Sequence, residues 1–172
     1  MHVTFDDRQF RNAMSQFCTG VVLVTGVSDG RPVGFAAQSF VSVSLSPPLV
    51  SISPARTTTT WPLLREARRF GINILGADQH GLCMAFARSG GDKFAQFGWT
   101  ASPAGTPVLD GVLGFVECEL EAEHDAGDHT VVLARVLAID VFSPDRSPLL
   151  FFRGRYGGFD EMPPERLSGP GG

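Results

Sequence analysis

Residues 34–48 read Gly34-Phe-Ala-Ala-Gln-Ser-Phe40 and then Val41-Ser-Val-Ser-Leu-Ser-Pro-Pro48. In the second part apolar and serine residues alternate, as in a β-strand with two unlike faces. The small residues of the first part leave room for a flat ligand to approach the backbone, where amide groups, Gln38 and Ser39 can bond the polar edge of a ring. A hairpin whose small residues only relieve crowding is the alternative. The pattern alone leaves both interpretations open.

The segments around this stretch predict more strands than helices. Val21–Thr25 is expected to be a buried strand, and the turn signal Ser28-Asp-Gly30 leads into a partner strand at 32–37. Further strands are predicted at 49–53, 70–75, 113–122, 129–142 and 148–152. Strands and helices do not alternate regularly, so an antiparallel barrel is favoured over a doubly wound sheet. The sequence contains neither G-x-G-x-x-G nor a P-loop, so a bound nucleotide must be held by other means.

Three helices are predicted. The first is capped by Asp6 or Asp7, places Phe10, Ala13, Met14 and Phe17 at helical spacing, and is expected to stop at Gly20. The second spans about 60–69, with Pro62 in its first turn, and the third spans about 78–88. We therefore expect a mainly β domain with a few helices.

Composition and charge narrow the class of protein. Hydrophobic residues make up 43% of the 172 residues, which indicates one folded domain, predicted over 1–160, with a disordered Pro/Gly-rich tail at 161–172. A net charge of −4 argues against a nucleic-acid partner. No signal peptide or membrane-spanning run is recognisable, and Cys18, Cys83 and Cys118 are each expected to be buried and unpaired. A cytoplasmic protein without a membrane partner is the prediction.

A cluster of hydroxyl and cationic groups precedes the second predicted helix. Arg56 is followed by four threonines, Thr57 to Thr60, where free backbone N–H groups favour an anion. The cluster is a candidate phosphate site, with Arg88 and Lys93 as further contacts. Ordinary helix capping by one threonine is the alternative.

Two later segments also contain chemically useful side chains. Gly127-Asp-His129 begins a long strand, and Asp128 can fix the orientation of the histidine there or serve as a turn residue. Arg153-Gly-Arg-Tyr156 follows the last strand. No histidine spacing indicates a metal site, and no nucleophile elbow is present, so an enzyme of this sequence must rely on a cofactor.

Taken in order, these segments resemble the short-chain flavin reductases that serve two-component flavin-dependent monooxygenases. The block Ser39-Phe-Val-Ser-Val-Ser-Leu-Ser-Pro-Pro48, with Gly127-Asp-His129 downstream, is the most specific part of the resemblance. It extends over about residues 7–160. Within the family, Gln16-Phe-Cys-Thr-Gly20, Ala37–Phe40, His124–His129 and Phe151–Gly154 most resemble the reductase of the steroid-degrading hydroxylase.

The resemblance implies an FMN-binding split barrel, a homodimer, and an NAD(P)H-dependent enzyme that reduces FMN or FAD for a separate monooxygenase component. NADH is the expected donor, and NADPH is the alternative. His129 is the implied contact to the nicotinamide nucleotide. Where the family often has hydroxyl residues, this chain has Ala36-Ala37-Gln38, so backbone bonds to the flavin are expected. The implied binding residues are Phe35, Ala36, Ala37, Gln38, Ser39 and Phe40 for the ring; Ser53, Pro54, Ala55, Arg56, Thr58, Thr59, Thr60, Phe86, Ala87, Arg88, Lys93 and Phe94 for the ribityl and phosphate groups; and Asp128, Arg155 and Tyr156 near the nucleotide.

Two other functions fit the same barrel. One is an oxidase that retains FMN, of the kind that acts on pyridoxamine phosphate. The other is a binding module for FMN or haem that has no catalytic activity.

Overall fold

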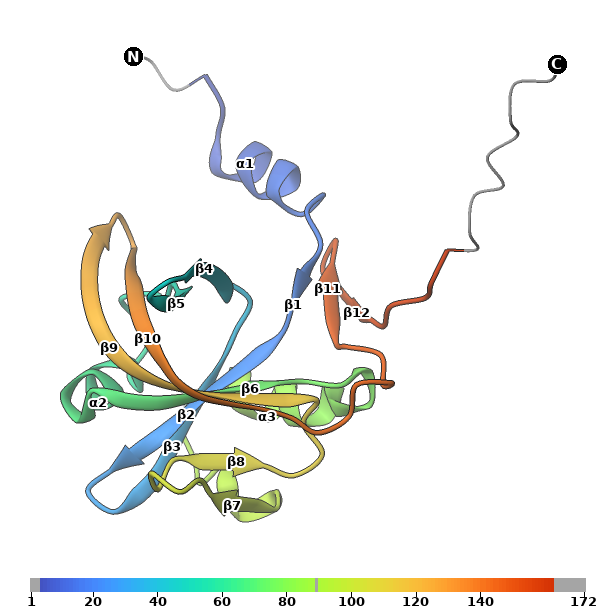
Figure 1. Cartoon of the computed structure of the whole chain (residues 1–172). Helices are drawn as coiled ribbons and strands as arrows, with labels where there is room; N and C mark the ends of the chain where they lie inside the picture. The colour runs from blue at the N-terminus through green and yellow to red at the C-terminus, as the bar shows by residue number, and fades with distance from the viewer. Residues whose placement is uncertain (1–3, 89, 163–172) are drawn as a thin grey trace, which may run out of the picture.

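A computed structural model describes residues 4–88 and 90–162. Its main element is a seven-stranded sheet in the order β3-β2-β6-β9-β10-β5-β4, in which every neighbouring pair is antiparallel (Figure 1). The strands of this sheet are β2 (Val22–Ser28), β3 (Arg31–Ala37), β4 (Val41–Leu45), β5 (Pro48–Ile52), β6 (Arg69–Ile74), β9 (Gly114–Ala126) and β10 (His129–Val141). The predicted antiparallel β class is thus confirmed.

Smaller elements surround this sheet. They are the helices α1 (Asp7–Met14), α2 (Trp61–Ala67) and α3 (His80–Ala87), the three-stranded sheet β1 (Thr19–Gly20), β11 (Leu150–Phe152) and β12 (Arg155–Gly157), the hairpin β7 (Trp99–Ala101) and β8 (Pro107–Leu109), and the 3-10 turns η1 (Ala77–Gln79) and η2 (Phe94–Gln96). No helix of the described residues is both long and apolar enough to cross a membrane.

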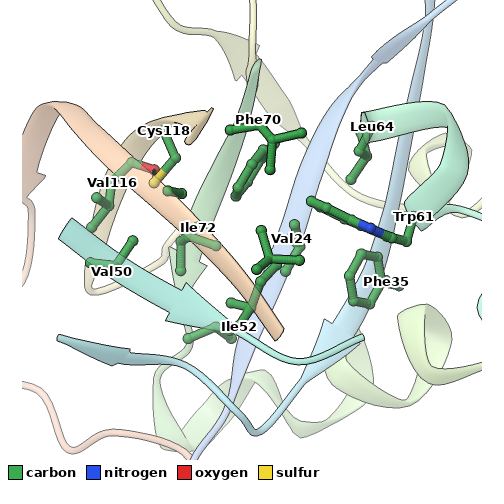
Figure 2. Close-up of a cluster of buried hydrophobic side chains, with 14 residues drawn as sticks. Val24, Phe35, Val50, Ile52, Trp61, Leu64, Phe70, Ile72, Val116 and Cys118 are labelled. Carbon is green, nitrogen blue, oxygen red and sulfur yellow. Dashed lines mark hydrogen bonds between the residues drawn. The ribbon is translucent and has the colours of Figure 1, made fainter. Parts of the chain in front are cut away.

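The sheet curls around one apolar core. Ile72 and Val24 lie at its centre, with Phe70 and Trp61 packed edge to face at a centroid distance of 5.5 Å (Figure 2). The indole N–H of Trp61 donates to Glu123 at 2.9 Å, which satisfies its one polar atom. Helix α2 therefore closes one side of the barrel.

A second apolar cluster lies between the sheet and α3. Phe86, Cys83 and Leu82 of the helix pack there with Leu23 of β2 and Leu75. Helix α3 is thus held close to β3 and β2, and the loop that follows it returns along β3.

The β7–β8 hairpin is attached through buried polar side chains. Asn73 donates to Thr25 Oγ1 at 2.9 Å and accepts from the Leu109 backbone N–H at 2.9 Å. Glu117 accepts hydrogen bonds from the hydroxyls of Ser102 and Thr106. Because buried polar groups are costly when unpaired, these bonds fix the position of the hairpin.

The first helix is shorter than predicted. It ends at Met14, and Phe17 lies beyond it, while Gly20 is part of β1 rather than a helix stop. Bonds from Gln16 N to Ala13 O and from Phe17 N to Met14 O turn the chain out of the helix toward β1. No residue of α1 is buried, and the helix stands clear of the barrel (Figure 1).

Other differences concern short elements and one cysteine. Strands β1, β7, β8 and β12 were not predicted, β9 extends four residues beyond its predicted end, and β11 begins two residues after its predicted start. Cys18, expected to be buried, is exposed; Cys83 and Cys118 are buried as predicted, and all three are free. The part of the predicted tail at 163–172 lies outside the described residues.

Candidate active site

A pocket of about 340 Å³ opens where the ends of β3 and β5 separate. On one side it is lined by residues 35–39 at the end of β3, and on the other by residues 53–55 and Thr58 after β5. Helix α3 contributes Cys83 and Ala87, and Val21, His129 and Tyr156 complete the wall. The volume lies within the range of small-molecule sites, so the structure leaves this space to a ligand instead of filling it with side chains.

The floor of this pocket presents small side chains and backbone. Ala36 and Ala37 are half-buried, whereas Phe35 is buried and its ring lies near Trp61 in the core (Figure 2). Phe35 therefore offers little more than its backbone to a ligand. A flat ring can approach this strand closely because no bulky side chain stands over it.

One hydrogen bond joins the two sides of the pocket. The Ser53 backbone N–H donates to Ser39 Oγ at 2.8 Å. The Ser39 hydroxyl serves as the acceptor, so its own proton stays available to a ligand.

His129 is held in the pocket wall by backbone bonds to the segment after β5. Thr130 N donates to Pro54 O at 3.0 Å, Arg56 N donates to Asp128 O at 2.9 Å, and Ala55 forms an isolated bridge with His129. The His129 Nδ1 atom lies 2.8 Å from Asp128 Oδ1. This hydrogen bond lowers the pKa of the exposed Asp128 carboxyl. With Nδ1 engaged, Nε2 is the ring nitrogen left for a ligand.

A second pocket of about 240 Å³ adjoins the first and is rich in hydroxyl and cationic groups. It shares Phe35, Ala36, Thr58 and Ala87 with the first pocket. Its remaining lining residues are Thr57, Thr59, Thr60, Phe86, Arg88 and Lys93. The Thr60 side chain makes no helix-capping bond, so ordinary capping does not account for the threonine cluster.

Lys93 is the most constrained cation of this second pocket. Its ammonium donates to Gly34 O at 3.3 Å and to Phe86 O at 3.1 Å, and it lies 5.8 Å from the centroid of the Phe86 ring. Burial lowers the pKa of this lysine. An ammonium has three N–H donors, so one remains for an anion in the pocket.

Cys83 and Tyr156 form a part of the wall that the sequence did not reveal as a pair. The Cys83 thiol lies 3.7 Å from the Tyr156 hydroxyl. Burial raises the pKa of Cys83 and raises the pKa of Tyr156 to about 12. Both groups are therefore neutral at physiological pH and act as polar but uncharged wall residues.

Several predicted residues lie outside these two pockets. Phe40 packs against the core, Arg56 pairs with Asp125 at 2.7 Å, and Asp128 reaches the site only through His129. Phe94 is buried below a groove that continues from the second pocket. Arg155 lines a separate cavity of about 770 Å³, which shares Tyr156 with the first pocket.

Most predicted binding residues are nevertheless brought together. The ring pocket contains the predicted residues Phe35, Ala36, Ala37, Gln38, Ser39, Ser53, Pro54, Ala55, Thr58, Ala87, His129 and Tyr156, and the adjoining pocket adds Thr59, Thr60, Phe86, Arg88 and Lys93. Val21 and Cys83 line the ring pocket but were not predicted. Their apolar surroundings in the sequence indicate only core positions, so no sequence signal would have identified them.

Comparison with known proteins agrees with this geometry. A model of the flavin reductase like domain matches residues 14–160. The chain belongs to this flavin reductase family. It is 44% identical to the reductase subunit HsaB of a flavin-dependent monooxygenase from Rhodococcus jostii, over 90% of this chain and 79% of that protein. It is 42% identical to the NADH-dependent FMN reductase SmoA of Agrobacterium fabrum, over 91% of this chain and 88% of that protein.

The fold agrees as well. The crystal structure of a nitrilotriacetate monooxygenase component B homologue from Mycobacterium thermoresistibile superposes with a TM-score of 0.88 and 40% identity, over 95% of this chain and 93% of that chain. The predicted family and split-barrel fold are confirmed. This flavin reductase has two adjoining pockets, one lined mainly by small side chains and one by hydroxyl and cationic groups, which we name the ring pocket and the phosphate pocket after the groups proposed for them.

The lowered pKa of Lys93 leads to a testable pH dependence. The ammonium loses its proton at lower pH than an exposed lysine does, so FMN affinity should decline early as pH rises into the alkaline range. Riboflavin has the same ring without the phosphate, so its affinity should not show this decline. Titration of both ligands by fluorescence quenching checks the prediction.

The variant Lys93→Gln provides the matched control. At neutral pH it should weaken FMN binding roughly ten-fold, as expected for loss of one charge-assisted hydrogen bond, and leave riboflavin binding nearly unchanged. Identical pH curves for FMN and riboflavin in the unmodified protein would show that Lys93 does not contact the phosphate.

Proposed function

We propose that this flavin reductase oxidises NADH, reduces a flavin that exchanges freely with solution, and supplies it to a separate monooxygenase component. The observation that supports this most directly is the open ring pocket between β3 and β5, with the His129 side chain in its wall. When both ligands are bound, the nicotinamide supplies a hydride that the flavin ring accepts at N5.

The chain's own residues bind and orient the two rings. Backbone groups at 36–38, together with the Ser39 hydroxyl, meet the polar edge of the isoalloxazine. Arg88, Lys93 and the threonines 57–60 hold the flavin phosphate in the adjoining pocket. Among the described residues, none that lines the ring pocket is Lys, Arg, Asp or Glu, so the contribution of the protein is chiefly alignment of the two reactants.

His129 positions the nicotinamide nucleotide. Asp128 fixes the ring tautomer from the solvent side, so Nε2 is directed to the ligand side. Because this polar contact lies in the wall of an open pocket, NADH can enter and NAD⁺ can leave without opening the core. Donors on the backbone stabilise negative charge on the reduced flavin ring.

The sparse side-chain bonding at the ring fits a flavin that is released after reduction. Ala36 and Ala37 present no hydrogen-bonding side chain, and the strongest polar contacts lie at the phosphate. A flavin-retaining oxidase needs a firmer hold on the ring. The proposed partner is therefore an oxygenase that collects reduced flavin, in the cytoplasm, where free thiols such as those of the three cysteines persist.

The proposed assembly is a homodimer. Two sets of apolar side chains are exposed in the single chain, one on β4 and one at the end of β10. Leu45 is 92% exposed, Ile139 67% and Val141 73%. Patches of this kind are rare on the free surface of a monomer, and a second copy of the chain is the proposed cover. The exposed apolar residues of α1 add to this surface.

Steady-state assay of the purified protein tests the function. NADH oxidation should depend on added flavin, and the flavin should turn over many times and pass to solution. Apoprotein without flavin should be inactive. The function is disproved if neither FMN nor FAD supports NADH oxidation, and a yellow protein reduced only by an amine would identify the oxidase instead.

Replacement of His129 separates nucleotide use from flavin binding. His129→Ala should raise KM for NADH about ten-fold, as expected for loss of a well-oriented polar contact, and leave flavin Kd nearly unchanged. Asp128→Asn should have a smaller effect in the same direction, since it acts through the tautomer. Unchanged NADH kinetics in His129→Ala would remove this residue from the site.

A charge at the end of β10 tests the dimer. Ile139→Arg should shift the protein toward monomer in analytical ultracentrifugation because a buried unpaired charge is costly. Glu66→Ala, at an exposed position of α2 away from these apolar sets, serves as the control and should leave the sedimentation coefficient unchanged. A monomeric unmodified protein at micromolar concentration contradicts the proposal.

A further inference from the structure

A groove leads from the phosphate pocket along β3, away from the ring pocket. Its first part, about 150 Å³, shares Thr59, Thr60 and Lys93 with the phosphate pocket. Its second part, about 650 Å³, shares Asp92 and Phe94 with the first part and ends at Arg31 and Trp99. The four hollows thus form one continuous path.

The length of this path exceeds what a single phosphate needs. Ala36 lines the ring pocket and Arg31 lines the far end, and both belong to β3. At the rise of an extended strand, the five steps between them span about 17 Å. The space beyond Lys93 therefore has room for a further nucleotide.

The side chains along the path change character in a definite order. The cations Lys93 and Arg88 come first, at the phosphate pocket. Asp92 follows, and its Oδ1 accepts from the backbone N–H groups of Phe94 and Ala95 at 3.2 and 3.1 Å. A carboxylate repels phosphate but accepts from hydroxyl groups, so a sugar suits this part of the groove.

An aromatic side chain stands at the far end. Trp99 packs edge to face on Phe94, with centroids 5.9 Å apart, and Phe94 packs in the same way on Phe86 at 5.0 Å. Trp99 is 37% exposed although its ring packs T-shaped against the buried Phe94. A partly exposed aromatic side chain held by a buried neighbour is a suitable platform for stacking a base.

Arg31 adds a free cation beside this platform. It begins β3 and is exposed, and among the residues that the structure describes it forms no ion pair. Its planar guanidinium can stack on an adenine that lies beside Trp99.

We propose that this groove binds the adenosine half of FAD, so that this reductase takes FAD in preference to FMN. The inference rests on the proposed flavin-reductase function and adds the choice of flavin. Phosphates at Lys93 and Arg88, ribose at Asp92 and adenine on Trp99 follow the order of the groups in the dinucleotide.

Binding measurements on the full-length protein test this assignment. Isothermal titration should give a lower Kd for FAD than for FMN. Trp99→Ala should raise the FAD Kd about ten-fold, the usual size of a lost base–aromatic stack, and leave the FMN Kd unchanged. Trp99→Phe should restore most of the FAD affinity, and Phe159→Ala, an exposed aromatic residue outside the groove, should affect neither ligand. Circular dichroism verifies that each variant is folded.

A second measurement uses AMP alone. AMP should bind to protein that is saturated with FMN, and Trp99→Ala or Arg31→Gln should abolish this binding. Equal loss of FAD and FMN affinity in Trp99→Ala, or no loss of either, overturns the inference. An increased KM for NADH with unchanged FAD binding also overturns it and assigns the groove to the nicotinamide nucleotide. In each of these cases NADH oxidation with flavin persists, so the proposed function is tested separately.

Discussion

Strand β3 and helix α3 approach each other at Gly34 as closely as a residue without a side chain allows. A Cβ atom there would lie 2.9 Å from Val24 O and 3.0 Å from the Phe86 ring. Lys93 reinforces the contact by donating to the carbonyls of Gly34 and Phe86. The end of α3 and the loop behind it are thereby held against the strand. The phosphate pocket depends on this contact, because Ala87, Arg88 and Lys93 line it from the helix side.

The ring pocket lies where the edges of the seven-stranded sheet do not pair with each other. Strands β3 and β4 are the two edges of the seven-stranded sheet, and the chain between them passes through Gln38 and Ser39. The hydrogen bond from Ser53 N to Ser39 Oγ holds the β3 and β5 ends at a fixed separation there. Backbone groups near this opening lack ladder partners on one side, which leaves them for a ligand. In a closed barrel the same backbone groups would form ladder hydrogen bonds with a neighbouring strand.

The long strands and most of the residues that line the two pockets could be predicted because their signals are local. Alternation of serine with valine and leucine at 41–45, and small residues at 34–37, are visible without tertiary information. The three-residue strands β7, β8 and β12 have no such signal. The β7–β8 hairpin is attached to the sheet through Asn73 and Glu117, and β12 is a strand only through its pairing with β11. Cys18 was expected to be buried because free cysteines usually are, but its segment lies on the surface.

For some side chains the sequence gives the position but not the direction of the side chain, because packing sets that direction. The sequence places Phe35 beside the ring site, yet the alternation of β3 turns its ring into the core near Trp61 (Figure 2). Arg56 belongs to the threonine cluster by position, but its guanidinium pairs with Asp125 across to the β9 strand. Cationic and hydroxyl side chains therefore gather in the second pocket, and the first pocket is lined mainly by backbone and small side chains. Under the proposed function this division suits release of the reduced flavin, because the flavin phosphate does not change during the reaction.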